Sequence, residues 1–144
     1  INDGAAMLLV AGSEAVKQHG LKPVARIVAS ATYSLAPKNF ADAPAKVIRK
    51  VVDKAGLQLH DIDLFEINEA FAAVPLVAIK QLQIDPDKVN VNGGAVSIGH
   101  PIGASGGRLA ATLIRELKQR QARYGVASLC IGGGEAVAVL FETV

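Results

Sequence analysis

A single histidine, His100, lies in the glycine-rich segment 90–108, which reads NVNGGAVSIGHPIGASGGR. Pro101 follows it directly and restricts the backbone of His100 toward extended conformations, while the neighbouring glycines allow a substrate to come close. The segment contains neither of the common glycine-rich phosphate-binding motifs, G-x-x-x-x-G-K-[ST] and G-x-G-x-x-G. Glycines alone would indicate a tight structural turn. The histidine among them favours a general base.

Two further stretches carry side chains or backbone groups that could do chemistry. In CIGGGEAVAV, Cys130 precedes three glycines. A lone cysteine at the end of a strand is most often a small hydrophobic residue, but the free backbone N–H groups of such a loop can form an oxyanion hole. In EINEAFAAV, Asn68 and Glu69 follow an apolar run. Asparagine at such a junction is a common helix cap, and a polar pair at the carboxyl end of a strand also fits a binding site of an α/β protein.

The hydrophobic pattern predicts the elements that must position these residues. Apolar runs predict strands over 5–11, 24–31, 62–67, 89–91, 124–130 and 136–141. Helices are predicted over 13–20, with Ser13 as N-cap, over 44–55 after a loop at 36–44, over 71–82, and along the stripe of Leu109, Leu113 and Leu117. Strands that alternate with helices indicate an α/β domain with a mostly parallel sheet flanked by helices.

Composition excludes several classes of function. The 144 residues carry a net charge of +2 without a basic stripe, and 4% are aromatic, so no nucleic-acid partner is expected. No run approaches the roughly 18 apolar residues of a membrane span, and one cysteine permits no internal disulfide. No metal site and no membrane partner are predicted. The hydrophobic content of 51% suggests that some apolar surface is shared with another domain or subunit.

Three motifs together resemble the C-terminal signatures of the thiolase family. NEAFA, NVNGGAVSIGHPIGASGGR and CIGGGEAVAVLFE occur in the family's order, and the likeness extends to the opening INDGAA. The stretch GHPIGASG is more similar to the biosynthetic acetyl-CoA acetyltransferases than to the long-chain degradative branch. The resemblance implies a thiolase-like layered fold, in which residues 1–21 end the N-terminal domain and residues 22–144 form the C-terminal domain.

The resemblance also implies a reaction and a role for each candidate residue. Thiolases join two acetyl-CoA molecules into acetoacetyl-CoA and CoA by a Claisen condensation, or run the reverse thiolysis, with coenzyme A thioesters as substrates and no covalently bound cofactor. By position, His100 resembles the base that activates the nucleophile, and Cys130 resembles the second cysteine, which moves a proton. Asn68 resembles the residue that holds a catalytic water, Gly132 the backbone donor of an oxyanion hole, and Phe71 a lining residue of the acyl pocket.

The family's nucleophilic cysteine has no counterpart among these residues, because Cys130 matches the other cysteine. The resemblance therefore implies a missing N-terminal thiolase half, and the chain is expected to be a fragment, a deliberately shortened chain or one piece of a split enzyme, inactive by itself. The complete protein is expected to be a homodimer or homotetramer in the cytoplasm, with the mitochondrion or peroxisome as eukaryotic alternatives. The helix of Leu109, Leu113 and Leu117 is a candidate for the face that meets the absent half.

Two alternatives stay open from the sequence. One is a non-catalytic half-domain or partner subunit of a split thiolase. The other is a cysteine hydrolase in which Cys130 is the nucleophile, His100 the base and Asn68 the residue that orients it.

Overall fold

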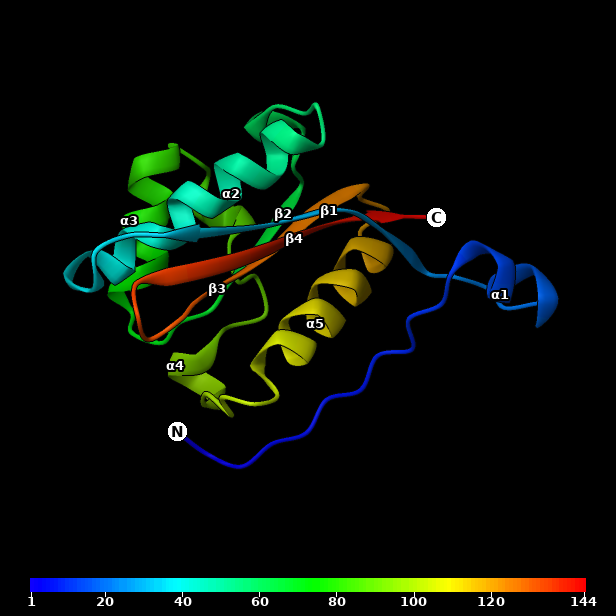
Figure 1. The fold of residues 1–144 in the computed structure, drawn as a ribbon, viewed down its shortest axis with the longest axis horizontal. Helices are drawn as coiled ribbons and strands as arrows, with labels where there is room; N and C mark the ends of the chain where they lie inside the picture. Colours follow the sequence, from blue (N-terminus) through cyan, green and yellow to red (C-terminus); the bar gives the residue numbers. More distant parts are fainter.

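The computed structural model describes residues 1–144 and contains one four-stranded sheet with helices on both faces (Figure 1). The strands lie in the order β1-β4-β3-β2, and their bounds are Ala25–Ser34 (β1), Leu64–Ile67 (β2), Tyr124–Cys130 (β3) and Glu135–Thr143 (β4). The predicted α/β class is confirmed. The expectation of a mostly parallel sheet is wrong, because β4 pairs antiparallel with both β1 and β3, and only β2 and β3 run parallel. The tight turn between β3 and β4 reverses the chain, whereas a parallel pair needs a long crossover.

The helices form a layer on each side of the sheet. Helices α2 (Ala43–Lys54) and α3 (Ala73–Leu82) cover one face, and α5 (Ser105–Gln119) covers the other (Figure 1). Short elements complete the chain: α1 (Ser13–Gln18), α4 (Ala95–Ile98) and the 3₁₀ turns η1 (Pro37–Asp42), η2 (Leu59–Asp61) and η3 (Pro86–Lys88). Helix α1 stands away from the sheet at one end of the molecule (Figure 1).

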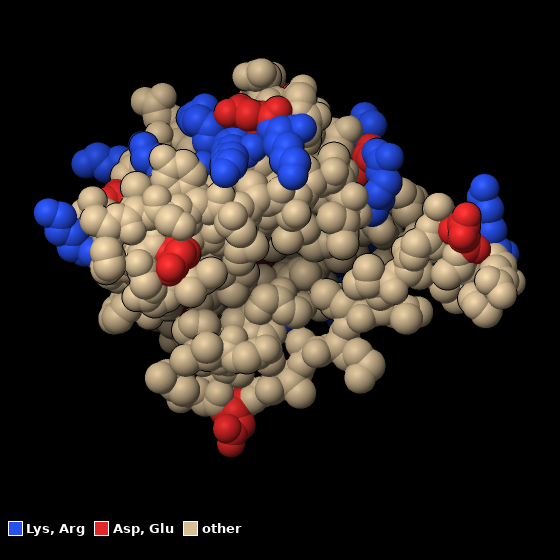
Figure 2. Space-filling view, viewed as in Figure 1, with Lys and Arg blue, Asp and Glu red and all other residues tan.

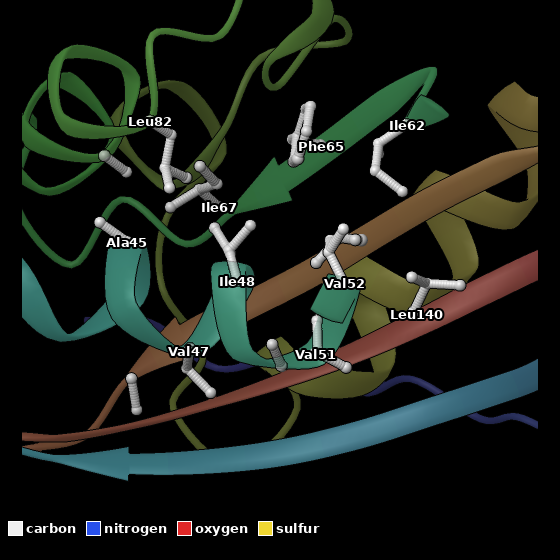
Figure 3. Close-up of a cluster of buried hydrophobic side chains, with 14 of the residues drawn as sticks. Ala45, Val47, Ile48, Val51, Val52, Ile62, Phe65, Ile67, Leu82 and Leu140 are labelled. Atoms are coloured by element: carbon white, nitrogen blue, oxygen red, sulfur yellow. The ribbon is translucent and has the colours of Figure 1, made fainter. Parts of the chain in front are cut away.

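The larger core lies between α2 and the sheet. Helix α2 begins with Pro44 in its first turn, as predicted, and ends before Gly56, whose φ of 71° favours glycine. Its buried stripe lies over the apolar side chains of β2 and β4, with the residues Val47, Ile48, Val51, Val52, Phe65, Ile67 and Leu140 at the centre (Figure 3). A stripe with this i, i+1, i+4, i+5 spacing buries one side of a helix.

Helix α5 packs on the opposite face through Leu109, Leu113 and Leu117, which are all fully buried. The expectation that this stripe meets an absent half is therefore wrong, because the chain's own sheet covers it. Gly125 on β3 makes the contact close, since a Cβ there would lie 2.8 Å from the terminal carbons of Leu113 and Leu117.

Four local predictions also differ from the structure. Residues 5–11 form no strand and are exposed, because no other strand of the chain lies beside them to accept their backbone hydrogen bonds. The predicted loop at 36–44 is largely the 3₁₀ turn η1, and Ser13 is the first residue of α1 rather than its cap. The strand predicted at 89–91 reduces to one parallel bridge between Val89 and Phe65.

Candidate active site

The candidate residues converge where β2 and β3 end. These two strands are parallel, so Asn68, directly after β2, and Cys130, the last residue of β3, lie at the same edge of the sheet. The turn that holds Gly132 continues from Cys130 into β4 at this edge. His100 reaches the same edge from the loop between α4 and α5, because its side chain contacts that of Asn68. The carboxyl ends of neighbouring strands are where α/β proteins commonly place their binding sites.

His100 is held on both ring nitrogens. The Nδ2 of Asn68 lies 3.2 Å from His100 Nε2, and the Oγ of Ser105 lies 2.6 Å from His100 Nδ1. The Ser105 hydroxyl donates its own proton to the carbonyl oxygen of Pro101 at 3.0 Å, so it is free to accept one. The network therefore assigns the proton of the neutral ring to Nδ1 and leaves the lone pair of Nε2 toward Asn68.

The surroundings of His100 favour the neutral imidazole. Burial lowers its pKa below the ordinary value of 6.5, and the positive charge of Arg108 lowers it further. A neutral ring whose Nδ1 proton is bound by a hydroxyl presents Nε2 as the basic atom. This is the form that a general base requires.

Asn68 is almost completely buried, and its side chain is only partly satisfied. Its backbone N–H donates to the carbonyl of Ser128 at 2.9 Å, which continues the pairing of β2 with β3. Its Nδ2 contacts His100, whereas its Oδ1 is buried without a hydrogen-bond partner in the protein. Buried polar atoms nearly always have a partner, often an ordered water. The free Oδ1 beside the imidazole is therefore a position for a bound water or a substrate group.

Cys130 is half-buried, and burial raises the pKa of its thiol above the ordinary value of 9.0. It stays protonated at neutral pH, which suits a group that donates a proton better than a ready nucleophile. No hydrogen bond joins it to His100, whose two ring nitrogens are engaged by Asn68 and Ser105. Both observations weigh against the cysteine-hydrolase alternative.

The three glycines after Cys130 have different structural roles. The backbone N–H groups of Gly132 and Gly133 donate to no protein acceptor, while Gly134 N–H bonds to the carbonyl of Ile131 at 3.1 Å. Gly134 has a φ of 95°, and a Cβ there would collide with the backbone of Leu35, so the turn requires glycine at this position. A Cβ at Gly132 would meet nothing within 4 Å. Gly132 therefore offers a free donor in open space, as an oxyanion hole needs.

Sequence reasoning missed the residues that fix the geometry of the glycine loop. Asn90 closes on the end of β2, since its Oδ1 accepts from Ile67 N–H and its Nδ2 donates to the Ile67 carbonyl, both at 2.8 Å. Glu69 accepts from Asn90 Nδ2 at 3.0 Å and from Val96 N–H at 2.8 Å, which ties the residue after Asn68 to the start of α4. Glycine at position 94 is needed there, because a Cβ would collide with the Glu69 carboxylate.

Ser105 was also missed, although its place in the same motif five residues after His100 was a usable signal. Phe71 has no hydrogen-bonding group in its side chain, and its only aromatic contact is with a residue outside the candidate set. Its ring is 64% exposed and packs edge-on against Phe40, with the ring centroids 5.8 Å apart. Within this chain the side chain lines no closed acyl pocket.

Charge is distributed unevenly over the molecule. In the space-filling view, Lys and Arg gather above α2, whereas the lower surface, toward α4 and the N-terminal segment, shows few charges (Figure 2). A surface hollow of about 540 Å³ beside α2 is lined in part by Lys46, Arg49 and Lys50 and contains none of the candidate residues. No cluster of three or more His, Cys, Asp or Glu side chains could hold a metal ion. None of the helices combines the length and the hydropathy that crossing a bilayer requires.

Comparison with known proteins assigns the fold and the loop to one family. The model of the thiolase C-terminal domain matches residues 21–143. The chain is 48% identical over 143 residues to an acetyl-CoA acetyltransferase of Shinella zoogloeoides, covering 99% of this chain and 36% of that protein. The crystal structure of the acetyl-CoA acetyltransferase of Bacillus anthracis superposes with a TM-score of 0.89 at 48% identity, over 92% of this chain and 34% of that one.

A crystal structure of human mitochondrial 3-ketoacyl-CoA thiolase is similarly close in fold, with a TM-score of 0.91 at 44% identity over 93% of this chain and 34% of that one. The chain belongs to the thiolase family and carries its C-terminal domain. It spans about a third of the length of the curated relatives it matches.

Proposed function

We propose that the chain supplies the histidine, asparagine and second-cysteine part of the active site of an acetyl-CoA C-acetyltransferase. The observation that carries the proposal is the contact of Asn68, His100 and Ser105, at 3.2 Å and 2.6 Å, at the sheet edge where Cys130 and the free amide of Gly132 lie. The Shinella zoogloeoides and Bacillus anthracis relatives, both named acetyl-CoA acetyltransferases, support acetyl-CoA and acetoacetyl-CoA as the substrates. The 3-ketoacyl-CoA thiolases at 44% identity are the competing assignment.

In the proposed reaction, His100 Nε2 takes the proton of a nucleophilic thiol contributed by the N-terminal thiolase half. That thiolate attacks the carbonyl carbon of acetyl-CoA, the acyl group is transferred to its sulfur, and the departing CoA thiolate takes the proton of the Cys130 thiol and leaves as CoA. The protonated Nε2 is then a donor to the carbonyl oxygen of the second acetyl-CoA, together with a water held at Asn68 Oδ1. The Cys130 thiolate takes a proton from the methyl carbon of that second acetyl-CoA, and the enolate carbon attacks the acyl carbonyl. The tetrahedral intermediate collapses to acetoacetyl-CoA as the nucleophilic sulfur leaves and regains its proton from His100. Gly132 N–H stabilises the oxyanion of that tetrahedral intermediate.

The same proposal assigns residues 1–21 to the end of the N-terminal domain and residues 22–144 to the C-terminal domain. Its support is the N-terminal segment, which makes no backbone hydrogen bond to the sheet and leaves Met7 93% exposed. The segment runs beside the glycine loop, since a Cβ at Gly107 would lie 3.1 Å from the Cβ of Ala6 and one at Gly4 would meet Pro101. This position supports the proposal that an N-terminal half adjoins His100 along the segment.

The remaining partner of the site is then the N-terminal thiolase half, and the complete protein is proposed to be a homodimer or homotetramer. Apolar side chains exposed beside the site fit such a contact. They are Val96, Ile98, Ile102 and Ile131. The cytoplasm remains the predicted compartment, although a cattle relative at 49% identity is named as mitochondrial.

A chimera tests the proposal. Residues 1–144 replace the matching C-terminal third of the Shinella zoogloeoides acetyl-CoA acetyltransferase, and thiolysis of acetoacetyl-CoA is measured against the same chimera with His100→Ala. We expect turnover in the first protein and a loss of roughly 10²–10⁴ in rate in the second. A folded chimera without turnover, or one whose rate is indifferent to His100, would refute the proposal. Faster cleavage of long-chain than of short-chain 3-ketoacyl-CoA would favour the competing assignment.

A further inference from the structure

Two polar links join β2 to the start of α5 side by side. The first runs from Asn68 through His100 to Ser105. The second joins Glu66 Oε2 to Arg108 Nη1 at 3.4 Å. Glu66 and Asn68 are two positions apart along an extended chain, so they point to the same face. Ser105 and Arg108 are three positions apart on the helix and are neighbours on its surface. The second link therefore lies next to the first.

The charge of Arg108 is poorly compensated in this position. Its side chain is largely buried, and its Nε and Nη2 atoms are buried with no acceptor in the protein. The distance of 3.4 Å to Glu66 exceeds the 2.7–2.9 Å typical of a charge-assisted hydrogen bond. Burial raises the pKa of Glu66 to about 7, and although Arg108 opposes this, the carboxylates of Glu69 and Glu116 add to it.

His100 titrates below its ordinary pKa of 6.5, where Glu66, with a pKa of about 7, is mainly the uncharged acid. Glu66 therefore does not cancel the positive charge of Arg108 at the pH that matters for the histidine. Among the other carboxylates near the two links, Glu116 is paired with Arg120 and accepts from Asn92, whereas Glu69 accepts from the neutral N–H groups of Asn90 and Val96; neither has a hydrogen bond to Arg108. In the 144-residue chain used in the test, the terminal amino group of Ile1 is the other positive charge that acts on His100.

We propose that Arg108 is a positioning residue of the candidate site, and that its buried guanidinium, oriented by Glu66, adds to the burial of His100 in favouring the neutral imidazole. The proposal rests on the proposed function, since neutrality matters to catalysis only if His100 accepts a proton. Arg108 itself touches no reacting atom. It acts through the charge that it places one helical turn beyond Ser105.

The test is the titration of His100 by NMR in the 144-residue chain, with His19→Gln and His60→Gln as a background that leaves His100 the only histidine. Arg108→Gln should raise the pKa of His100. Arg108→Lys, which keeps a charge, should raise it less. Glu66→Gln is the matched control. It should leave the pKa of His100 nearly unchanged, because the Glu66 carboxyl is already neutral in the pH range where His100 titrates. The double variant Glu66→Gln/Arg108→Gln should show the same rise in the pKa of His100 as Arg108→Gln. It is measured in place of Arg108→Gln if that single variant does not fold.

An unchanged pKa of His100 in Arg108→Gln and in the double variant would overturn the proposal. So would an equal rise in Arg108→Lys and Arg108→Gln, since shape rather than charge would then be responsible. A large fall in the pKa of His100 in Glu66→Gln would show that the Glu66 carboxyl is ionised and cancels the charge of Arg108. This result would also contradict the proposal. None of these measurements needs turnover, so an inactive chimera would refute the proposed function and leave this inference standing. In an active chimera, Arg108→Gln should move the acidic limb of the rate profile to higher pH.

Discussion

Glu66 is a carboxyl group in the core, and its replacement by glutamine should make the protein more stable at high pH. The residue is 2% exposed, and its pKa is raised from 4.5 to about 7, chiefly by burial. An acid whose pKa is higher in the folded than in the unfolded state binds more protons when folded. Its contribution to stability is therefore complete below pH 4.5 and is lost as the pH rises through about 7. A difference of this size corresponds to about 3 kcal/mol.

Glutamine resembles the protonated acid in shape and cannot ionise, so Glu66→Gln should not show this loss. The free energy of unfolding of both proteins is measured by urea titration at about pH 5 and about pH 8, with circular dichroism as the signal. From about pH 5 to about pH 8, the free energy of unfolding of the wild type should fall by about 2–3 kcal/mol more than that of the variant. Glu14→Gln, the same change at an exposed carboxylate of α1, is the control and should gain little. An equal difference between Glu66→Gln and the wild type at both pH values would refute the reasoning, because Glu66 would then titrate alike in both states.

Other expectations follow from the site and the packing. The 144-residue chain alone should form no acetoacetyl-CoA, because it contains one cysteine, which we propose as the acid/base rather than the nucleophile; steady product formation by the purified chain contradicts this. In the complete enzyme, His100→Ala should slow both half-reactions and Cys130→Ser mainly the Claisen step, each by roughly 10²–10⁴, so equal loss of acyl-enzyme formation rejects the division of roles. Gly125→Ala should cost about 1–3 kcal/mol in thermal or urea unfolding through overpacking against α5, while Gly106→Ala, which lies in α5 and meets nothing within 4 Å, should cost nothing and gain up to about 1 kcal/mol from helix propensity. The chain alone should also bind a hydrophobic dye or self-associate because of the apolar side chains exposed around α4; sedimentation as a monomer that ignores the dye argues against an absent half.

The sequence determined the elements whose signals are local. The period of the apolar residues predicted α2, with Pro44 in its first turn, and the run 124–130 matches β3 to the residue. These patterns reflect which face each segment buries, and burial acts on neighbouring positions of the same element. The motif around His100 is equally local and by itself indicates the thiolase family.

Tertiary structure decided the features that depend on which segments meet. The segment 5–11 has the composition of a buried strand, yet it is exposed because a strand requires a neighbour to bond. The direction of β4 followed from its turn with β3 rather than from its own residues. Ser105 became part of the site only when α5 began beside the histidine, and Glu66 and Arg108, which are 42 positions apart, became partners only when α5 packed on β2. Hydrogen bonds and charges act over a few ångströms in space, and sequence alone does not say which distant residues come within that range.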